Sequence, residues 1–451
     1  MPAIKIQTTD DNLVSHAGLA LTAIFYTSQE FKNAINSVSL KNKKRKSGAF
    51  SDYQIIISYI SMLCLGKTAF ARISTLKQGE FYNQILGLEH IPSEATIRHR
   101  LEEMPEAMND CIKQLTDKLL KNYAILTTCL NTEFIPLDID VSCQDNSGSK
   151  KEKVSCTYKM RDGFATIFSY LGGTGFMLDN ELRAGSDHCN CAGTDKFILN
   201  CIQKARSITD KKILCRLDSG NDSVTNYLAM VSQPDCYYIV KHNIRRESKE
   251  EYYDLVEKSD CKKIIDERKT TFFYSDYCEL KIPGDKSKTF KTCRVIRLIK
   301  TAEKKSGQLF LLPSYELDIW YTNLAESYLA EDIVNLYKDH ATSEQFHSEL
   351  KTDMDVERLP SGKFSCNKLI MVLANFAYNI LKIIGQEALI SQQFNRKRPV
   401  QRIRIKTVLQ DIIYLACRFV TKSRQKIIQL SSNSNFRVPF LYVFNKFKLI
   451  C

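Results

Sequence analysis

The sequence predicts a mixed α/β fold flanked by a helical region and a basic region, and three observations lead to this prediction. Between residues 132 and 242, short apolar runs typical of strands alternate with amphipathic runs typical of helices. The 451 residues are 44% hydrophobic and 10% aromatic, which is enough to bury a sizeable core. The chain is also long enough for several structural units, at roughly 100–200 residues per domain.

The expected organisation has five segments, separated where the composition changes. They are a helical N-terminal domain (1–130), the first part of the α/β domain (131–242), a β-rich insertion (243–315), the second part of the α/β domain (316–385) and a basic C-terminal tail (386–451).

In the first segment, residues 55–65, 70–78 and 107–126 carry helical patterns with few turn signals. Residues 92–101 begin with a Pro-Ser turn and continue as a short helix that bears Arg98 and Arg100. This segment suits the second helix of a helix-turn-helix, whose leading residues face the DNA major groove. A plain surface helix accounts for the same pattern equally well. The run KNKKRK at 41–46 is expected to be a solvated linker or a phosphate contact.

The second segment reads β-β-β-α-β-α-β, which describes a mixed sheet. The expected strands are 134–141, 165–171, 176–182, 212–217 and 236–242, and the expected helices are 197–205 and 222–232. Further strands are expected at 271–280, 290–299, 309–312 and 317–322, followed by helices at about 330–351 and 369–381.

The distribution of charge and the cysteine content indicate which binding partners and which cellular compartment to expect. Of the formal net charge of +13, most comes from residues 386–451, where 13 Lys and Arg face only Glu387 and Asp411. Such a region is typical of a polyanion-binding arm. The 16 cysteines include no Cys-x-x-Cys pair, and no leader-like run opens the chain, so reduced thiols and a cytoplasmic location are expected. The apolar runs 55–65 and 369–381 fall short of the roughly 20 residues that span a bilayer, so no membrane partner is expected.

Acidic residues on separate elements are the candidates for chemistry. Asp138 and Asp140 are two apart on one strand and leave the same face of it. Asp218 follows another strand where it enters a glycine-containing loop, and Glu344 lies on the 330–351 helix. Carboxylates in such a set suit Mg²⁺ or Mn²⁺, and two such ions can activate an attacking oxygen and stabilise a leaving oxygen of a phosphodiester. The alternative interpretation is that these acids are surface residues or helix caps.

These residues also carry a family resemblance that spans about residues 50–385. Tyr337, His340, Glu344 and Lys351 follow the spacing Tyr-x₂-Arg-x₃-Glu-x₆-Lys, with His340 in place of the arginine. Asp140-Val-Ser and Asp218-Ser-Gly match two aspartate motifs. The sequence thus resembles the DDE transposases of bacterial insertion sequences that carry this Tyr-Arg-Glu-Lys signature, and within them it is most similar to the insertion sequence 1380 family.

The resemblance implies an RNase H-like catalytic domain interrupted by a β-rich insertion, and a DNA-binding N-terminal domain. It implies cleavage at element ends and joining of the freed 3′-OH to target DNA, by a dimer on double-stranded DNA in a bacterial cytoplasm. Asp140, Asp218 and Glu344 would be catalytic and would hold Mg²⁺ or Mn²⁺, with two ions expected, and Asp138 competes with Asp140. The DNA-binding candidates, from the resemblance and from the basic segments, are Tyr337, His340, Lys351, Arg98, Arg100, Arg396, Lys397 and Arg398.

Two other functions fit the same residues. One is a metal-dependent nuclease on the same fold that does not transfer strands. The other is a transposase-derived DNA-binding protein with a dead site, which the presence of all three acids disfavours.

Overall fold

The computed structural model describes residues 4–39, 50–77, 79–130, 132–187, 189–245, 247–266, 268–303, 309–391 and 400–448. The chain divides into two compact units. Unit 1 comprises Met1–Ile125, Gln144–Val154 and His347–Cys451, and unit 2 comprises Leu126–Cys143 and Ser155–Phe346.

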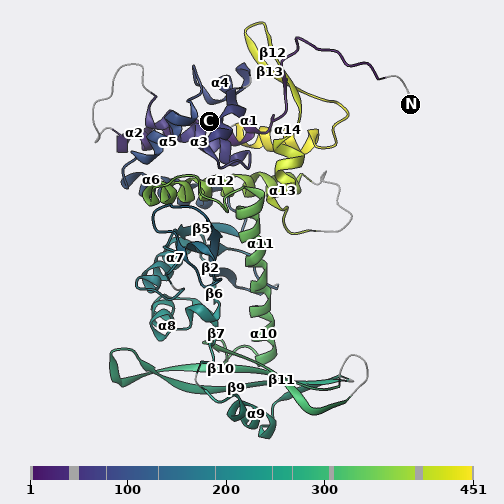
Figure 1. The fold of residues 1–451 in the computed structure, drawn as a ribbon. Coiled ribbons are helices and arrows are strands. Elements are labelled where there is room, and N and C mark those ends of the chain that lie inside the picture. Colours follow the sequence, from purple (N-terminus) through teal and green to yellow (C-terminus); the bar gives the residue numbers. More distant parts are fainter. Residues whose placement is uncertain are drawn as a thin grey trace. The chain divides into compact units, whose positions relative to one another are not determined.

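Unit 2 is built on a mixed ten-stranded sheet, several strands of which are labelled in Figure 1. The strand order is β3-β4-β2-β6-β7-β11-β10-β9-β8, with β5 paired to β4. The strands are β2 (Ile135–Asp145), β3 (Ser155–Cys156), β4 (Asp162–Leu171), β5 (Phe176–Glu181), β6 (Ile213–Leu217), β7 (Cys236–Lys241), β8 (Lys262–Asp266), β9 (Lys269–Ile282), β10 (Asp285–Glu303) and β11 (Leu309–Thr322). The mixed α/β fold predicted from the sequence is therefore confirmed.

The strands β2, β6 and β7 run parallel and form the buried centre of this sheet. Helices α7 (Thr194–Ile208) and α8 (Val224–Val231) lie along one side of them, and α10 (Ala330–Lys338), η3 (Asp339–Ala341) and α11 (Thr342–Ser348) lie along the other (Figure 1). Ile333, Val334 and Leu336 of α10 pack into a core with Leu214, Ile239 and Trp320. Because both faces are covered, the residues of these parallel strands are mostly buried, including the charged Asp138 and Arg216.

The insertion is continuous with this sheet. Strand β11 runs unbroken to Thr322, and its last residues pair with β7 at Trp320↔Lys241 and Thr322↔Ile239. The sequence suggested two separate strands, at 309–312 and 317–322. Antiparallel pairing with β10 over almost the whole length of β11 joins them into one strand. A helix that was not expected, α9 (Lys249–Lys258), precedes β8.

Unit 1 is mainly helical, and α12 (Phe364–Ile390) packs against its α3, α6 and α14. Its elements are three short strands and several helices besides α12. These are β1 (Leu13–Val14), α1 (Leu19–Ala23), α2 (Gln29–Ser39), α3 (Asp52–Cys64), η1 (Phe70–Lys77), α4 (Glu80–Leu86), α5 (Glu94–Glu102), α6 (Ala107–Tyr123), the π-helix η4 (Glu349–Asp353), α13 (Ile405–Val408), the π-helix η5 (Leu409–Ile413), β12 (Cys417–Lys422), β13 (Gln425–Leu430) and α14 (Arg437–Phe447).

Helix α12 is longer than the 13 apolar residues that the sequence suggested. It has 27 residues, and by length and composition alone it could cross a membrane. Its most apolar 18-residue window is, however, completely buried inside the structure. We therefore describe α12 as the core helix of unit 1.

The predicted basic C-terminal tail is folded, which corrects the prediction of a tail. Strand β12 pairs with β1 at Leu13↔Arg418 and with β13, so this region completes a three-stranded sheet with the chain's first strand. Several of its cations form ion pairs with acidic residues of unit 1. The pairs are Arg402–Glu349, Arg404–Asp353, Arg418–Asp11 and Lys446–Glu387.

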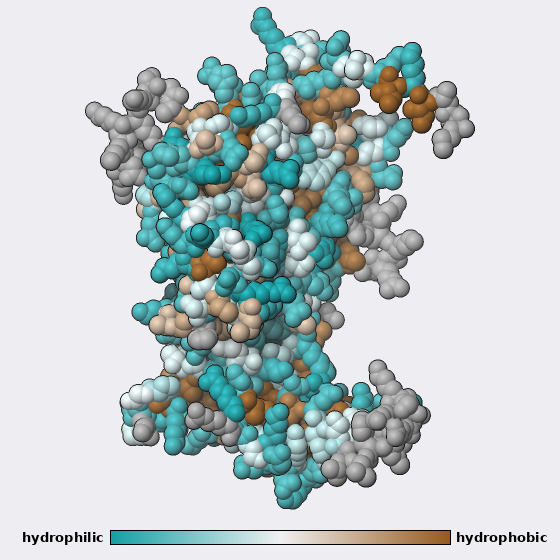
Figure 2. Space-filling model, viewed as in Figure 1, coloured by the Kyte–Doolittle hydropathy of each residue, from teal (hydrophilic) through white to brown (hydrophobic). Residues whose placement is uncertain are grey.

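The surface is predominantly hydrophilic on the face drawn in Figure 2, with scattered brown patches of apolar residues. Among the described residues, all cysteines are free thiols, and many of them are buried. The expectation of reduced, packed thiols agrees with this arrangement.

Candidate functional site

The register of β2 and β6 brings two of the predicted acids to one edge of the sheet. Asp138 pairs with Arg216 and Ile139 with Leu217, so Asp140 and Asp218 follow at the next position of each strand. Asp218 caps the short helix η2 (Ser219–Asn221), since its Oδ1 accepts hydrogen bonds from Gly220 N at 3.2 Å and Asn221 Nδ2 at 2.7 Å. Asp218 therefore stands at the carboxyl end of β6, where α/β sheets commonly bind ligands, and Asp140 lies within β2 just past its last pair with β6.

The charge of Asp140 affects the ionisation of Asp218. Burial raises the pKa of Asp218, and the neighbouring Asp140 raises it further, while Asn221, His340 and the Gly220 amide act in the opposite direction. A carboxylate that disfavours the ionisation of a neighbouring carboxyl makes the surroundings locally negative. A divalent cation between them would relieve this repulsion.

Asp138 has a different environment from Asp140. Its Oδ1 accepts from Arg216 Nε at 2.6 Å, its Oδ2 from Arg216 Nη2 at 2.8 Å, and His340 Nδ1 lies 3.0 Å from Oδ1. Burial acts to raise the pKa of Asp138, but Arg216 and His340 bring it below its ordinary value. Both oxygens of Asp138 are thus engaged in a buried ion pair, whereas Asp140 on the same strand is only half-buried. This geometry favours Asp140 over Asp138 as the candidate ligand.

The segment that carries Glu344 crosses the same edge of the sheet. Arg216 Nη1 donates to the Leu336 carbonyl at 2.8 Å and to Asp339 Oδ2 at 2.9 Å, which ties this segment to β6. Burial raises the pKa of Tyr337, and the charges of Asp218 and Asp140 raise it further. Tyr337 therefore lies in the field of both candidate ligands.

Glu344 itself is exposed on α11. His340, four residues earlier in η3, is by contrast buried against Asp138 on β2. Two residues after Glu344, the ring of Phe346 packs 5.2 Å from that of Tyr170 on β4, which fixes α11 to the sheet.

The residues fit a divalent cation in part. Within the part of the chain that the structure describes, no three His, Cys, Asp or Glu side chains form a group that could hold a metal ion. The Asp140–Asp218 pair offers oxygen donors of the kind that Mg²⁺ and Mn²⁺ prefer. The three predicted acids are therefore not preassembled, and Glu344 stays a predicted ligand.

Comparison with known proteins gives the family. A family model described as the transposase DDE domain group 1 matches residues 1–450. The chain belongs to the DDE transposase family. Members of this family are transposases, and in general they cut and join DNA strands with divalent metal ions. The family resemblance inferred from the aspartate and Tyr-Glu-Lys motifs is confirmed at this level.

Comparisons with curated proteins and with solved structures do not extend this family assignment. No curated protein matches the chain. Among solved structures, it is similar to the piggyBac transposase synaptic complex with hairpin DNA, with 10% sequence identity over 89% of this chain and 80% of that chain. The TM-score is 0.43, at which the likeness supports no conclusion about this DDE family member.

The predicted DNA-binding residues of this DDE family member lie in several environments. Tyr337 and His340 lie in unit 2 beside the aspartates, and His340 is buried. Lys351 belongs to η4 in unit 1, where its Nζ lies 3.7 Å from Glu357 Oε2. Arg396, Lys397 and Arg398 fall outside the described residues, as do residues 41–46 and His188.

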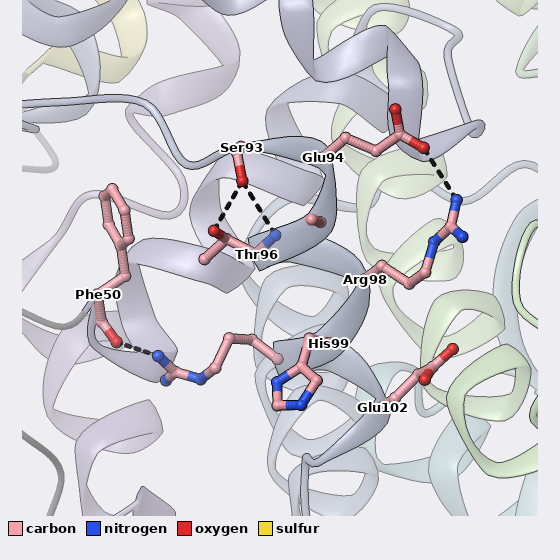
Figure 3. A pocket seen from close by; sticks show the side chains of 9 residues that line it. Phe50, Ser93, Glu94, Thr96, Arg98, His99 and Glu102 are labelled. Atoms are coloured by element: carbon pink, nitrogen blue, oxygen red, sulfur yellow. Dashed lines mark hydrogen bonds and ion pairs between the residues drawn. The ribbon is translucent and has the colours of Figure 1, made fainter.

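Helix α5 of unit 1 lines a groove of about 990 Å³ (Figure 3). Ser93 caps this helix, because its Oγ accepts from Thr96 N at 3.1 Å. Arg98 is exposed but donates to Glu94 Oε1 at 2.9 Å, as Figure 3 shows. Arg100 is buried and donates to Asp52 Oδ1 at 2.6 Å. The structure thus gives Arg100 a structural partner and leaves Arg98 as the more accessible cation.

Arg216 and Cys189 also lie near the predicted acids, and neither is among the site residues predicted from the sequence. Arg216 is completely buried between Asp138 and Asp339. In the sequence, Arg216 is an arginine within the otherwise apolar strand 213–217. Because a buried charge requires a partner, this position was the signal for a buried ion pair. Cys189 lies near Asp218, and in the sequence it belongs to the cluster His188-Cys189-Asn190-Cys191, which could hold a metal ion but lacks the second pair of a zinc site.

Proposed function

We propose that this DDE family member is a transposase of an insertion sequence resembling the 1380 family, with an RNase H-like catalytic domain. It would cleave DNA strands at the element ends and join the freed 3′-OH to target DNA. The observation that carries the proposal is the parallel register of β2 and β6, which sets Asp140 beside Asp218 at one edge of the sheet.

Asp140, Asp218 and Glu344 would hold two Mg²⁺ or Mn²⁺ ions. Bound there, the ions would activate the attacking oxygen and stabilise the leaving oxygen of the phosphodiester. Because the three acids are not preassembled, we infer that Glu344 completes the site when metal and DNA are present. The exposed position of Glu344 on α11 is compatible with such a movement.

Asp138, Arg216 and His340 would serve as a support beneath this site. His340 takes the place of the signature arginine, and it lies buried against Asp138. A buried imidazole on a carboxylate orients its neighbours rather than gripping DNA phosphate. We therefore propose that His340 positions the segment carrying Glu344 and that the Tyr337 hydroxyl lies nearer the DNA.

Double-stranded DNA is the proposed partner, both as element ends and as target, with at least a dimer assembled on it. Exposed cations would supply the sequence-independent part of the affinity. The exposed candidates are Arg98 and, in the turn between β12 and β13, Lys422 and Arg424, beside the sequence-predicted Lys351, Arg396, Lys397 and Arg398.

The test is cleavage of a supercoiled plasmid that carries the DNA flanking the gene. The wild-type protein should nick and join this DNA with Mg²⁺. Asp218→Asn should abolish cleavage and leave DNA binding within about twofold of the wild type, because it removes a metal ligand and no phosphate contact. Asp210→Asn, an exposed loop change, is the matched control and should cleave normally. Persistent cleavage by Asp218→Asn would refute the site assignment.

The same assay separates the two rival functions. A nuclease without strand transfer would produce nicked DNA but no joined products. A DNA-binding protein with a dead site would shift the DNA in a gel and leave it uncut with either Mg²⁺ or Mn²⁺.

A further inference from the structure

An exposed turn lies beside the strand that carries Asp140. It joins β3 to β4, two antiparallel strands at the end of the ten-stranded sheet. Residues 158–161 of this turn have the sequence Tyr-Lys-Met-Arg, and all four are exposed. The aromatic Tyr158 is 55% exposed and the apolar Met160 is 83% exposed. Because two such side chains stand in solvent within three residues, the turn is a candidate contact surface.

Backbone hydrogen bonds hold this turn in one conformation. The Arg161 carbonyl accepts from the Thr157 amide at 2.9 Å and from the Thr157 hydroxyl at 2.8 Å. The Met160 amide donates to the Thr157 carbonyl at 2.9 Å, and Thr157 is itself buried. Met160 has a φ of +56°, which residues with a side chain rarely adopt. The turn therefore presents Met160 at a fixed place, at a cost in backbone strain.

The Tyr158 side chain connects this turn to the proposed catalytic strand. Its hydroxyl donates to the Val141 carbonyl at 3.3 Å, and Val141 is the residue that follows Asp140 on β2. The Lys159 ammonium lies 5.7 Å from the centre of the Tyr158 ring. An aromatic face, a cation and an apolar tip thus occur on one short turn that is tied to the residue after Asp140.

These three side chains match the groups with which proteins open a stacked DNA strand. An apolar side chain such as methionine can insert between neighbouring base pairs, and an aromatic ring can stack on a base that is exposed in this way. A lysine beside them can pair with a backbone phosphate. A stable protein interface typically buries about 800 Å² on each partner, which is far more than two side chains offer. The chemistry of the turn therefore favours DNA as its partner.

We propose that this turn is a wedge that opens DNA next to the cleavage site. Met160 separates the base step beside the phosphodiester that is cut, Tyr158 stacks on the exposed base, and Lys159 contacts the phosphate. Separating one base step makes the duplex easier to bend there, which lets the phosphodiester approach the carboxylates. The inference rests on the proposed function, because it takes the DNA to be cut to lie at Asp140 and Asp218.

The experiment uses the full-length protein and a set of duplexes that together cover the DNA flanking the gene, each with 2-aminopurine at one position. The fluorescence of this base rises when it is unstacked. It is measured without divalent metal, so that the result does not depend on cleavage, and at protein concentrations that saturate the duplex in a gel shift. We expect the wild type to raise the fluorescence at one site, next to the position that is cut when Mg²⁺ is added.

Substitutions in the turn should change this signal selectively. Met160→Ala should remove the rise, whereas Met160→Leu, which keeps an apolar tip, should retain it. Tyr158→Ala should lower the affinity for the opened DNA by about tenfold, because stacking on the base is lost, and Tyr158→Phe should keep most of it. Leu130→Ala is the matched control, since Leu130 is also exposed and has a φ of +43°, but precedes the first residue of β2. A thermal melt of each variant establishes that it is folded.

Cleavage of a mismatched duplex gives a second readout. Met160→Ala should cut the intact duplex about tenfold more slowly than the wild type, because the base step must open without the wedge. It should cut a duplex with a mismatch at that step nearly as fast as the wild type, because a mismatch already weakens stacking. A merely structural role of Met160 would slow both substrates alike.

Two results would overturn the inference. One is a fluorescence rise that is the same in the wild type and in Met160→Ala. The other is a wild-type complex without any unstacked base, as expected if the turn contacts a protein instead of DNA. In either case, loss of cleavage in Asp218→Asn would leave the proposed function standing. Conversely, unstacking that requires Met160 would keep the wedge even if Asp218→Asn still cleaved, so the two failures are distinguishable.

Discussion

At the scale of single residues, buried charges distinguish the supporting groups from the reactive ones. Asp138 and Asp140 leave the same face of one strand, and their sequence spacing gives no reason to prefer either. Arg216 decides between them, because it engages both oxygens of Asp138 from the neighbouring strand. This could not be predicted from the sequence, since it depends on the register of β2 against β6.

The buried pair gives a stability prediction. Asp138→Asn would take from the buried Arg216 guanidinium the carboxylate that engages its Nε and Nη2 and leave only Asp339 as its charged partner, and removing one member of a buried pair costs about 3–5 kcal/mol. The melting temperature should fall clearly. Glu94→Gln, which removes the acid of the exposed Arg98 pair, is the control and should cost less than about 1 kcal/mol. Equal melting temperatures for the two variants would contradict this account.

His242 gives a prediction about pH. Its Nδ1 lies 2.7 Å from Asp222 Oδ2, its Nε2 lies 2.9 Å from Glu247 Oε2, and its ring packs 4.9 Å from Tyr321. Burial acts to lower the pKa of His242, but Asp222 and Glu247 raise it above 6.5. The folded state thus binds this proton more tightly than the unfolded chain, and the resulting stability is present below pH 6.5 and lost as pH rises through the higher folded pKa.

The corresponding measurement is the difference in melting temperature between wild type and His242→Gln across pH. This difference should be largest below pH 6.5 and should shrink on the alkaline side. Introducing Glu247→Gln should reduce the pH dependence, because one of the two raising charges is removed. A melting-temperature difference that grows with pH would show that the pKa of His242 is not raised in the folded state.

At the scale of elements, local patterns predicted most strands, and tertiary contacts determined the rest. The strands expected at 165–171, 212–217 and 236–242 match β4, β6 and β7 to within a few residues, because buried apolar runs with turn signals are local features. The single strand β11 and the folded C-terminal region depend on partners far along the chain. The segment expected as a helix at 70–78 is instead the 3₁₀-helix η1.

The turn between β4 and β5 gives a prediction about the element that carries Glu344. A side-chain carbon on Gly175, whose φ is +72°, would lie 2.3 Å from the Phe346 ring on α11. Gly175→Ala should therefore displace α11, lower stability by more than about 1 kcal/mol and reduce DNA cleavage. Gly148→Ala is the matched control, because Gly148 has the same φ and open space around it. If both variants melt and cleave alike, Phe346 does not fix α11 in this way.

At the scale of the whole molecule, the family model extends over both units, since it matches residues 1–450. We therefore expect residues of both units to take part in binding or cutting DNA. The sequence located the positive charge near the C-terminus, and the structure shows that Arg402, Arg404, Arg418 and Lys446 of this region form ion pairs with acids of unit 1. The remaining exposed cations are the candidates for phosphate contacts.

Variants in the β12–β13 turn test the electrostatic, sequence-independent part of DNA binding. The double variant Lys422→Ser/Arg424→Ser should weaken DNA binding by a similar factor on different sequences. It should also reduce the slope of log affinity against log salt by up to about 0.9 for each lost phosphate contact. The charge-conserving variant Lys422→Arg/Arg424→Lys should bind as the wild type does. An unchanged salt slope in the double serine variant would exclude this turn from the interface.

The central claim is that Asp140, Asp218 and Glu344 meet around divalent cations when DNA is bound. The most direct measurement replaces Mg²⁺ by Fe²⁺ in the protein–DNA complex and maps the backbone cuts that hydroxyl radicals produce beside the bound iron. The account predicts cuts near residues 140, 218 and 344 together, all of them lost in Asp218→Asn and suppressed by excess Mg²⁺. Cuts near 140 and 218 that never include 344, or cuts that persist in Asp218→Asn, would contradict it.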